Sequence, residues 1–148
     1  MVLIRRATVY DIPEIIEILS LTYDNLEGME YQLSMELKNK NYYTFYLDND
    51  NSTFISVERI GNYKAQLHIY TKKGSGGKRL KRVCKEIVED IKKTHNYTSL
   101  LIFVPEDNVA GRIMAMNGGM DRIGEIKDAD GLNRNEILYS ISIGENYV

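Results

Sequence analysis

The segment TKKGSGGKRLKRVCKEI, residues 71–87, combines three glycines with a run of cations. Seven Lys and Arg and no acid lie from Lys72 to Lys85, although the whole chain has a net charge of −2. Glycines ahead of a helix leave its first backbone N–H groups accessible, and the helix dipole adds positive potential there. A phosphate binds well at such a turn, because the missing Cβ atoms let it approach closely. The segment therefore indicates a site for a phosphorylated ligand, and a solvated turn with chance cations is the alternative.

Three common kinds of phosphate site do not fit this segment. The P-loop spacing of Gly, four residues and Gly-Lys-Ser/Thr is absent, which argues against a kinase or GTPase. The strands before the loop are expected to be antiparallel, which argues against a dinucleotide fingerprint. The acidic net charge argues against a dedicated nucleic-acid binder. A local nucleic-acid contact through Arg79, Arg82 and Lys85 stays open as a third hypothesis.

Composition predicts one domain over residues 1–148. The chain is 43% hydrophobic and 27% charged, values typical of a soluble globular protein. Cys84 is the single cysteine, so no disulfide can form within the chain. No apolar run reaches the roughly 18 residues of a membrane span, and the first residues lack the apolar core of a signal peptide. We expect a cytoplasmic protein without a membrane partner, and the few His and Cys residues do not have metal-ligand spacing.

The phosphate segment needs elements on both sides to position it. Residues 2–6 predict a short strand, and Thr8 with Asp11 has the spacing of a capping box before a helix whose apolar face is Ile12, Ile15, Ile16 and Leu19. A second helix is expected near residues 31–38. Three strands over residues 42–47, 52–60 and 65–71 have connections too short for parallel crossovers, so they predict an antiparallel meander.

The second half of the chain predicts a crossover and a hairpin. A long helix follows the glycines, and residues 99–104 form a continuous apolar run typical of a strand buried on both faces. Strand, helix and buried strand together predict a βαβ unit with two parallel strands. A short helix through Ile113 and Met116 and a terminal hairpin over 121–128 and 135–143 complete the chain.

The segment VPEDNVAGRIMAMNGGM resembles a signature of the GNAT family of N-acetyltransferases. In that family an Asn after the buried strand is followed by a small residue at +3 and by Gly-Phe at +11 and +12. Asn108, Gly111, Gly119 and Met120 have this spacing here. Many GNAT enzymes also carry a Tyr at +7 that is proposed to protonate the departing thiolate. This chain has Ala115 at that position, which leaves the general acid unassigned.

The glycine segment KKGSGGKRL also resembles the coenzyme A pyrophosphate loop of this family. Placing Gly77 on the second glycine of the loop puts Ser75 on the first and Lys72 on its basic position. The alternative register uses Lys73 and Gly76, and it leaves a lysine where a glycine or alanine is expected. We prefer the first register, because the helix pattern then lines up with that of the family.

The resemblance covers about residues 2–143 and implies a fold, a cofactor and an activity. The fold would be a GNAT-like α/β (α+β) domain, with a mixed, largely antiparallel sheet of about six or seven strands, three or four flanking helices and one parallel crossover. The activity would be transfer of an acetyl group from acetyl-CoA to a primary amine of a small molecule or protein. The alternative is a GNAT-like binding or structural protein without turnover, similar to compact proteins of tailed phages, and homodimers are common in the family.

The resemblance also implies site residues. The pantetheine arm of the coenzyme would lie between strands 65–71 and 99–104. The implied cofactor-binding residues are Ile69, Tyr70, Lys72, Lys73, Gly74, Ser75, Gly76, Gly77, Lys78 and Asn108. Asn108 has an alternative role as the cap of the short helix.

His68 and Glu58 are the catalytic candidates. Acetyl transfer needs a neutral amine, and an ammonium group loses its proton only near pKa ~10, so a base is useful. His68 lies in the strand before the glycine segment, and its ordinary pKa of ~6.5 suits a base. Glu58 lies on the preceding strand. The alternative for both is a structural or merely exposed side chain.

Overall fold

The computed structural model describes residues 2–72, 78–129, 131 and 133–144, and of Lys78 the backbone alone. The strands are β1 (Ile4–Arg6), β2 (Tyr43–Asp48), β3 (Thr53–Arg59), β4 (Lys64–Thr71), β5 (Ser99–Pro105), β6 (Asp121–Ile126) and β7 (Glu136–Ser142). The helices are α1 (Ile12–Leu19), α2 (Met29–Lys38), α3 (Lys78–Thr94) and α4 (Val109–Asn117), with a 3-10 turn η1 (Val9–Asp11) before α1. Within these ranges, no helix is both long and apolar enough to cross a bilayer.

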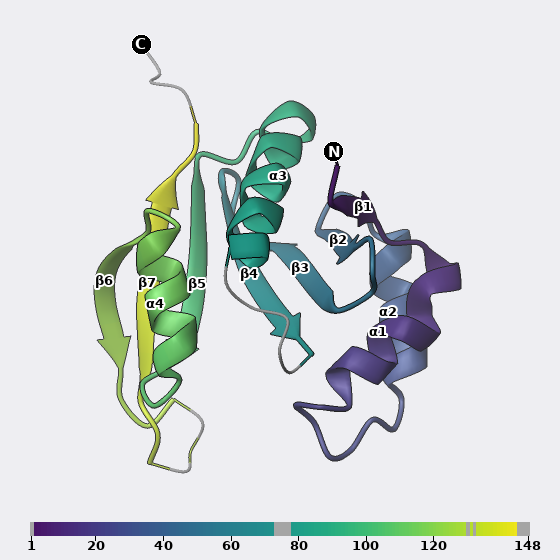
Figure 1. Cartoon of the computed structure of the whole chain (residues 1–148), viewed down its shortest axis with the longest axis horizontal. Helices are drawn as coiled ribbons and strands as arrows, with labels where there is room; N and C mark the ends of the chain where they lie inside the picture. Colours follow the sequence, from purple (N-terminus) through teal and green to yellow (C-terminus); the bar gives the residue numbers. More distant parts are fainter. Residues whose placement is uncertain (1, 73–77, 130, 132, 145–148) are drawn as a thin grey trace.

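The seven strands form one sheet in the order β1-β2-β3-β4-β5-β7-β6 (Figure 1). Neighbouring strands are antiparallel except for β4 and β5, which are parallel and are connected through α3. The meander, the crossover and the terminal hairpin are therefore confirmed, and so is the predicted fold class. The predicted boundaries differ from the observed ones by one or two residues at most strand ends.

Helices cover both faces of the sheet. Helices α1 and α2 pack on one face, and α3 and α4 pack on the other (Figure 1). Side chains along a strand alternate between the faces, so Phe54 packs with α1 and α2 while Ile55 packs with α3. Each face thus has its own apolar core, and β3 and β4 separate the two.

The capping box at the start of the first helical segment is confirmed. The Thr8 backbone N–H donates to Asp11 Oδ2 at 2.7 Å, and the Tyr10 N–H donates to Thr8 Oγ1 at 3.3 Å. The box begins the 3-10 turn η1, and α1 continues from it at Ile12. This start fixes α1 over the face of the sheet that carries Phe45 and Phe54.

Strands β4 and β5 diverge after a short paired stretch. Their parallel pairing runs from Lys64–Ser99 to Leu67–Ile102. Beyond this point β4 stays paired with β3 as far as Thr71, and β5 stays paired with β7 as far as Pro105. The two strands separate toward their carboxyl ends (Figure 1). The facing edges of residues 68–71 and 103–105 therefore have no β4–β5 ladder between them.

Strand β5 corrects one expectation. The apolar run 99–104 predicted a strand buried on both faces, but only Leu100, Ile102 and Val104 are buried. Leu101 and Phe103 are half-buried. The reason is that the described core beneath α1 and α2 contains residues of β2, β3 and β4 but none of β5. An apolar run alone does not show which helices will cover it.

Candidate active site

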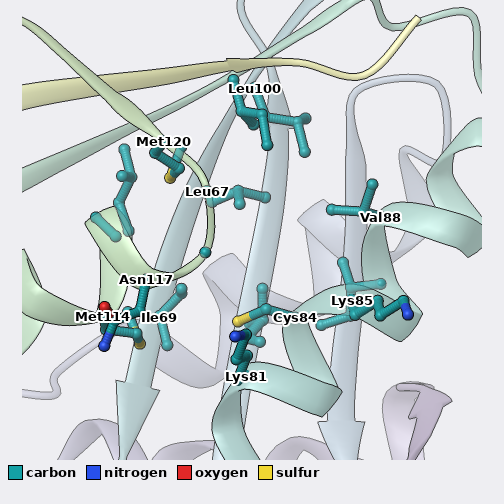
Figure 2. Close-up of a pocket in the computed structure, with 16 residues that line it drawn as sticks. Leu67, Ile69, Lys81, Cys84, Lys85, Val88, Leu100, Met114, Asn117 and Met120 are labelled. Carbon is teal, nitrogen blue, oxygen red and sulfur yellow. The ribbon is translucent and has the colours of Figure 1, made fainter.

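A cavity of about 290 Å³ lies between α3 and α4, above the divergence of β4 and β5 (Figure 2). Its lining residues are Ile55, Leu67, Ile69, Lys81, Cys84, Lys85, Ile87, Val88, Leu100, Ile102, Met114, Ala115, Asn117, Gly118, Met120 and Ile141. Most of these side chains are aliphatic or sulfur-containing. The cavity can therefore take an extended, weakly polar ligand by excluding water from apolar surface.

Two lysines stand at the rim of this cavity. Lys81 and Lys85 line it from exposed positions one helical turn apart on α3, as Figure 2 shows. Their ammonium groups can meet negative charge on a ligand whose apolar part lies deeper. An anionic group at the open end and an apolar chain at the inner end fit this distribution.

Cys84 contributes its sulfur to the cavity wall between these lysines (Figure 2). Burial raises the pKa of the Cys84 thiol to about 11. The thiol is therefore protonated at neutral pH and behaves as a small apolar group. Because the sequence has no other cysteine, a thiol reagent that modifies the protein reports on this cavity alone.

Consecutive residues of β4 point to opposite sides of the sheet. Leu67 and Ile69 line the cavity between α3 and α4, whereas His68 and Tyr70 line a second pocket under α1 and α2. Of the two residues predicted beside the pantetheine arm, Ile69 thus has its side chain in the cavity. The Tyr70 side chain lies on the other face, stacked on Phe54 with ring centroids 5.9 Å apart.

The second pocket, which we call the acceptor-side pocket, has a volume of about 280 Å³. Its lining residues are Leu19, Tyr23, Met29, Gln32, Leu33, Glu36, Tyr43, Phe45, Phe54, Ser56, Glu58, His68 and Tyr70. It differs from the cavity in carrying aromatic rings, two carboxylates and an imidazole. Because both voids border β4 where it leaves β5, ligands in them can approach each other at the divergence.

His68 and Glu58, the predicted catalytic residues, come together in the acceptor-side pocket. The His68 Nε2 atom lies 3.5 Å from Glu58 Oε2, and the two side chains are 35% and 38% exposed. The carboxylate oxygen can orient the imidazole ring, and partial exposure gives both side chains access to solvent. The pair can therefore accept a proton from a bound group and pass it on.

Tyr23 and Tyr70 close one side of the same pocket. Their hydroxyl oxygens are 3.0 Å apart, and their rings are 6.0 Å apart. Burial, the hydrogen bond with Tyr23 and the charges of Tyr23 and Glu36 raise the pKa of Tyr70. Tyr70 therefore keeps its proton at neutral pH and offers a hydroxyl group rather than a phenolate.

Of the predicted pyrophosphate loop, Lys73, Gly74, Ser75, Gly76 and Gly77 lie outside the described residues, as does the side chain of Lys78.

Two cations flank residues 73–78 in the sequence, Lys72 before them and Arg79 after them, and the side chains of both contact acidic residues. Lys72 Nζ lies 3.2 Å from Glu17 Oε1 of α1, and Arg79 lies 3.6 Å from Asp48 Oδ2 and from Asp50 Oδ1. Both cations are thus directed toward protein carboxylates in this structure.

Asn108 is the cap of α4. Its side-chain Oδ1 accepts a hydrogen bond from the Gly111 backbone N–H at 3.0 Å. A Cβ atom at Gly111 would lie 2.7 Å from Asn108 Nδ2 and 3.0 Å from Val104 Cγ1. The Asn-to-small-residue spacing therefore has a structural cause, because the capping amide and β5 occupy the space that a side chain would need.

The Gly119-Met120 pair ends α4 and closes the cavity. Gly119 has φ +83°, a left-handed conformation that favours glycine. The Met120 N–H donates to the Ala115 carbonyl at 3.1 Å, and its side chain lines the cavity. The buried Ala115 lines the same cavity with a methyl group. Position 115, seven residues after Asn108, therefore offers no hydroxyl group to the cavity.

Sequence reasoning predicted only a few of the side chains that line the two pockets. Lys81 was counted among the cations but assigned to no site, and Lys85 was considered only for a nucleic-acid contact, although both positions border the apolar stripe of α3. Glu36 and Tyr43 gave no local signal, because α2 and β2 meet β4 only through the tertiary fold.

A protein-family model described as "Protein of unknown function (DUF2824)" matches residues 7–145. No sequence among curated proteins matches the chain. Solved structures match over nearly the full length. The ribosomal-protein-S5-alanine acetyltransferase of Vibrio fischeri is 15% identical, with a TM-score of 0.79 over 98% of this chain and 94% of that one.

Two Salmonella typhimurium structures match similarly. One, assigned as an acetyltransferase and solved with its cofactor acetyl-CoA, is 15% identical, with a TM-score of 0.80 over 98% of this chain and 95% of that one. The other is an acetyltransferase that modifies the N-terminal serine of ribosomal protein L7/L12. It is 16% identical, with a TM-score of 0.78 over 94% of this chain and 93% of that one. The likeness shows that this chain has the GNAT fold.

Proposed function

The chain belongs to the family described as protein of unknown function DUF2824, and because it also has the GNAT fold, we propose that it is an acetyl-CoA-dependent N-acetyltransferase. The acceptor would be a primary amine of a small molecule or a protein. The observation that carries the proposal is the pair of voids on opposite faces of β4 at its divergence from β5. One void suits a coenzyme and the other suits an amine.

The cavity between α3 and α4 fits the coenzyme in three respects. Its walls are apolar, Lys81 and Lys85 supply positive charge at its rim, and Ala115 leaves its floor open. Beside it, residues 68–71 of β4 have backbone edges that β5 does not pair. These edges can bind an extended chain carrying amide groups. Residues 72–78 would bind the diphosphate, with the two rim lysines reinforcing them.

Bound acetyl-CoA would supply an activated acetyl thioester at the divergence. In the proposed reaction His68 removes the proton of the acceptor ammonium, and Glu58 stabilises the imidazolium that forms. The free amine would then form a bond to the thioester carbonyl carbon as the carbon–sulfur bond breaks, and the departing thiolate would take up a proton from solvent while the amide nitrogen loses its second proton. Backbone N–H groups along the open edge of β4 can donate to a carbonyl oxygen that gains negative charge. The Ala115 methyl group donates no proton, so in this proposal catalysis comes mainly from positioning and deprotonation.

Titration calorimetry with acetyl-CoA tests the proposal. We expect saturable binding that weakens roughly tenfold in a Lys81→Ala/Lys85→Ala variant, since charge-assisted contacts to phosphate are worth about 1–2 kcal/mol. A Lys92→Ala/Lys93→Ala variant is the matched control, because these two lysines lie in the last turn of the same helix, away from the cavity. Absence of heat and of thermal stabilisation at millimolar acetyl-CoA would remove the proposal.

Ala115 favours a second candidate function, binding of the coenzyme without turnover. A GNAT-like protein without a general acid can serve as a binding or structural module. Saturable binding of acetyl-CoA with no acetylation across a broad amine panel would support this candidate. Formation of any N-acetylated product, detected by mass spectrometry, at a rate above the uncatalysed reaction would exclude it.

A further inference from the structure

The acceptor-side pocket carries negative charge and aromatic surface together. Glu36 and Glu58 line it, and its described lining contains no Lys or Arg. Burial first, and then the charges of Glu58 and Glu36, raise the pKa of Tyr43. The charges of both carboxylates therefore reach Tyr43 in this pocket. A cation that enters the pocket would meet an attractive electrostatic potential.

Glu36 is held in place for such a contact. It is half-buried on α2, and the Gln32 side-chain amide donates to its Oε1 atom at 2.8 Å. Within the described residues no Lys or Arg forms a salt bridge with Glu36 or Glu58. Glu36 differs in this from Glu17, which lies 3.2 Å from Lys72 Nζ. Glu36 can thus bind the cationic group of a ligand without first breaking a salt bridge to a lysine or arginine of the protein.

Aromatic rings extend along the floor of the pocket. Ring centroids are 6.2 Å apart between Tyr43 and Phe45, 5.3 Å between Phe45 and Phe54, and 5.9 Å between Phe54 and Tyr70. Aromatic faces attract ammonium groups and also contact the methylene chain that connects two of them. This floor runs from Tyr43 of β2 to Tyr70 of β4, and the charge of Glu36 acts on both of these tyrosines.

We propose that the acceptor is an amine with a second positive charge, such as an alkyl diamine or a lysine-like chain. One amine would lie at His68 and Glu58 beside the β4–β5 divergence, and the second charge would lie at Glu36 over the aromatic floor. An acceptor that carries a carboxylate at its far end would be disfavoured by Glu36. The inference rests on the proposed acetyltransferase function and adds a substrate class to it.

Three probes of equal chain length test this inference: 1,5-diaminopentane, pentylamine and 5-aminopentanoate. They share a five-carbon chain, and the far end is positive in the first, neutral in the second and negative in the third. With saturating acetyl-CoA, we expect kcat/KM for the diamine to exceed that for pentylamine roughly fivefold to tenfold, and 5-aminopentanoate to be the poorest acceptor. Acetylated products are measured by mass spectrometry.

A pair of variants on α2 locates the charge preference. Glu36→Gln should lower the ratio of diamine to pentylamine activity to about twofold or less, because the far ammonium loses its ionic partner. Glu30→Gln, an exposed change on the same helix outside the pocket, should leave the ratio as in the unmodified protein. The inference would be overturned by equal kcat/KM values for the three probes or by a higher value for 5-aminopentanoate. It would also be overturned if Glu36→Gln and Glu30→Gln had the same ratio of diamine to pentylamine activity.

Binding without turnover separates this inference from the proposed function. Each probe is titrated into the protein alone and followed by NMR, so that the preference is read even if no acetylation occurs. Tighter binding of the diamine, lost in Glu36→Gln, supports the inference whatever the activity. Equal affinities, or no binding of the diamine, overturn it. Failure to bind acetyl-CoA in calorimetry overturns only the proposed function.

Discussion

The two faces of β4 differ in what they offer a ligand. On one face, Leu67 and Ile69 border a cavity of mainly aliphatic side chains with lysines at its rim. On the other, His68 and Tyr70 border a pocket of aromatic rings and carboxylates. The two-residue period of a strand makes this separation possible within four consecutive positions. A single strand can therefore present a coenzyme side and an acceptor side without mixing their chemistry.

The separation also divides the expected effects of substitution. Changes on the cavity face should weaken binding of acetyl-CoA, and changes on the pocket face should affect use of the amine. A substitution that changes both acetyl-CoA binding and amine use would contradict this division, and one that changes only the expected property would support it.

Filling the cavity should have the largest effect. Cys84→Phe places a ring in the space beside Ile69, and we expect acetyl-CoA affinity to fall at least about 100-fold, or ~2.7 kcal/mol. Calorimetry measures the affinity, and thermal unfolding verifies that the variant is folded. Cys84→Ala is the control, because it keeps the cavity open and should bind as the unmodified protein does. Unchanged acetyl-CoA affinity in Cys84→Phe would contradict the assignment of the cavity face of β4 to the coenzyme.

Removing the base should act on the other face. His68→Gln should lower kcat/KM for the amine about 100-fold and change the dissociation constant of acetyl-CoA less than about twofold. His95→Gln is the control, because His95 Nε2 lies 3.0 Å from Thr44 Oγ1 outside both pockets. A His68 variant with normal turnover would remove the assigned base.

The cap of α4 should influence stability rather than chemistry. Gly111→Ala forces a Cβ atom against Asn108 and Val104, and we expect it to lower the free energy of unfolding by roughly 1–3 kcal/mol. Chemical denaturation measures the change. Gly124→Ala in β6 is the matched control, since nothing lies within 4 Å of its added Cβ. Equal stability of the two variants would contradict the packing described at Asn108.

The tyrosine pair should give the smallest effect. Tyr23→Phe removes the hydroxyl that lies 3.0 Å from the Tyr70 hydroxyl at an exposed side of the pocket. We expect the KM of the amine to rise about twofold to fivefold, the cost of one ordinary hydrogen bond. Steady-state kinetics measure it, and the dissociation constant of acetyl-CoA should stay constant. A larger change on the acetyl-CoA side would show that the two faces are coupled.

Local periodicity explains what the sequence could predict. The alternation of β4, the βαβ crossover and the Asn108–Met120 spacing depend on residues close together in the chain. Of these, the spacing has the most direct cause, since the cap at Asn108 excludes a side chain at Gly111 and Gly119 takes a left-handed φ. Such constraints can be read from sequence because each depends on a few local dihedral angles and contacts.

Long-range placement explains what the sequence could not predict. Arg79 looked like a phosphate ligand, but it lies against Asp48 at the end of β2 and Asp50 in the turn that follows, far earlier in the chain. Glu36 contributes to the acceptor-side pocket only because α2 packs over β2. The half-buried Leu101 likewise depends on where α1 and α2 end. Which partner a side chain meets is decided by packing between distant elements.

Alkylation of Cys84 by iodoacetamide, with and without saturating acetyl-CoA, tests most directly whether the cavity between α3 and α4 holds the coenzyme. Only the thiolate reacts, and the pKa of Cys84 is about 11, so the rate should rise roughly tenfold per pH unit from pH 7 to 10 in the free protein. Bound acetyl-CoA should slow the reaction more than about tenfold at every pH, because it would cover the sulfur. An alkylation rate that is unchanged while calorimetry shows the coenzyme bound would place it elsewhere and contradict the proposed site.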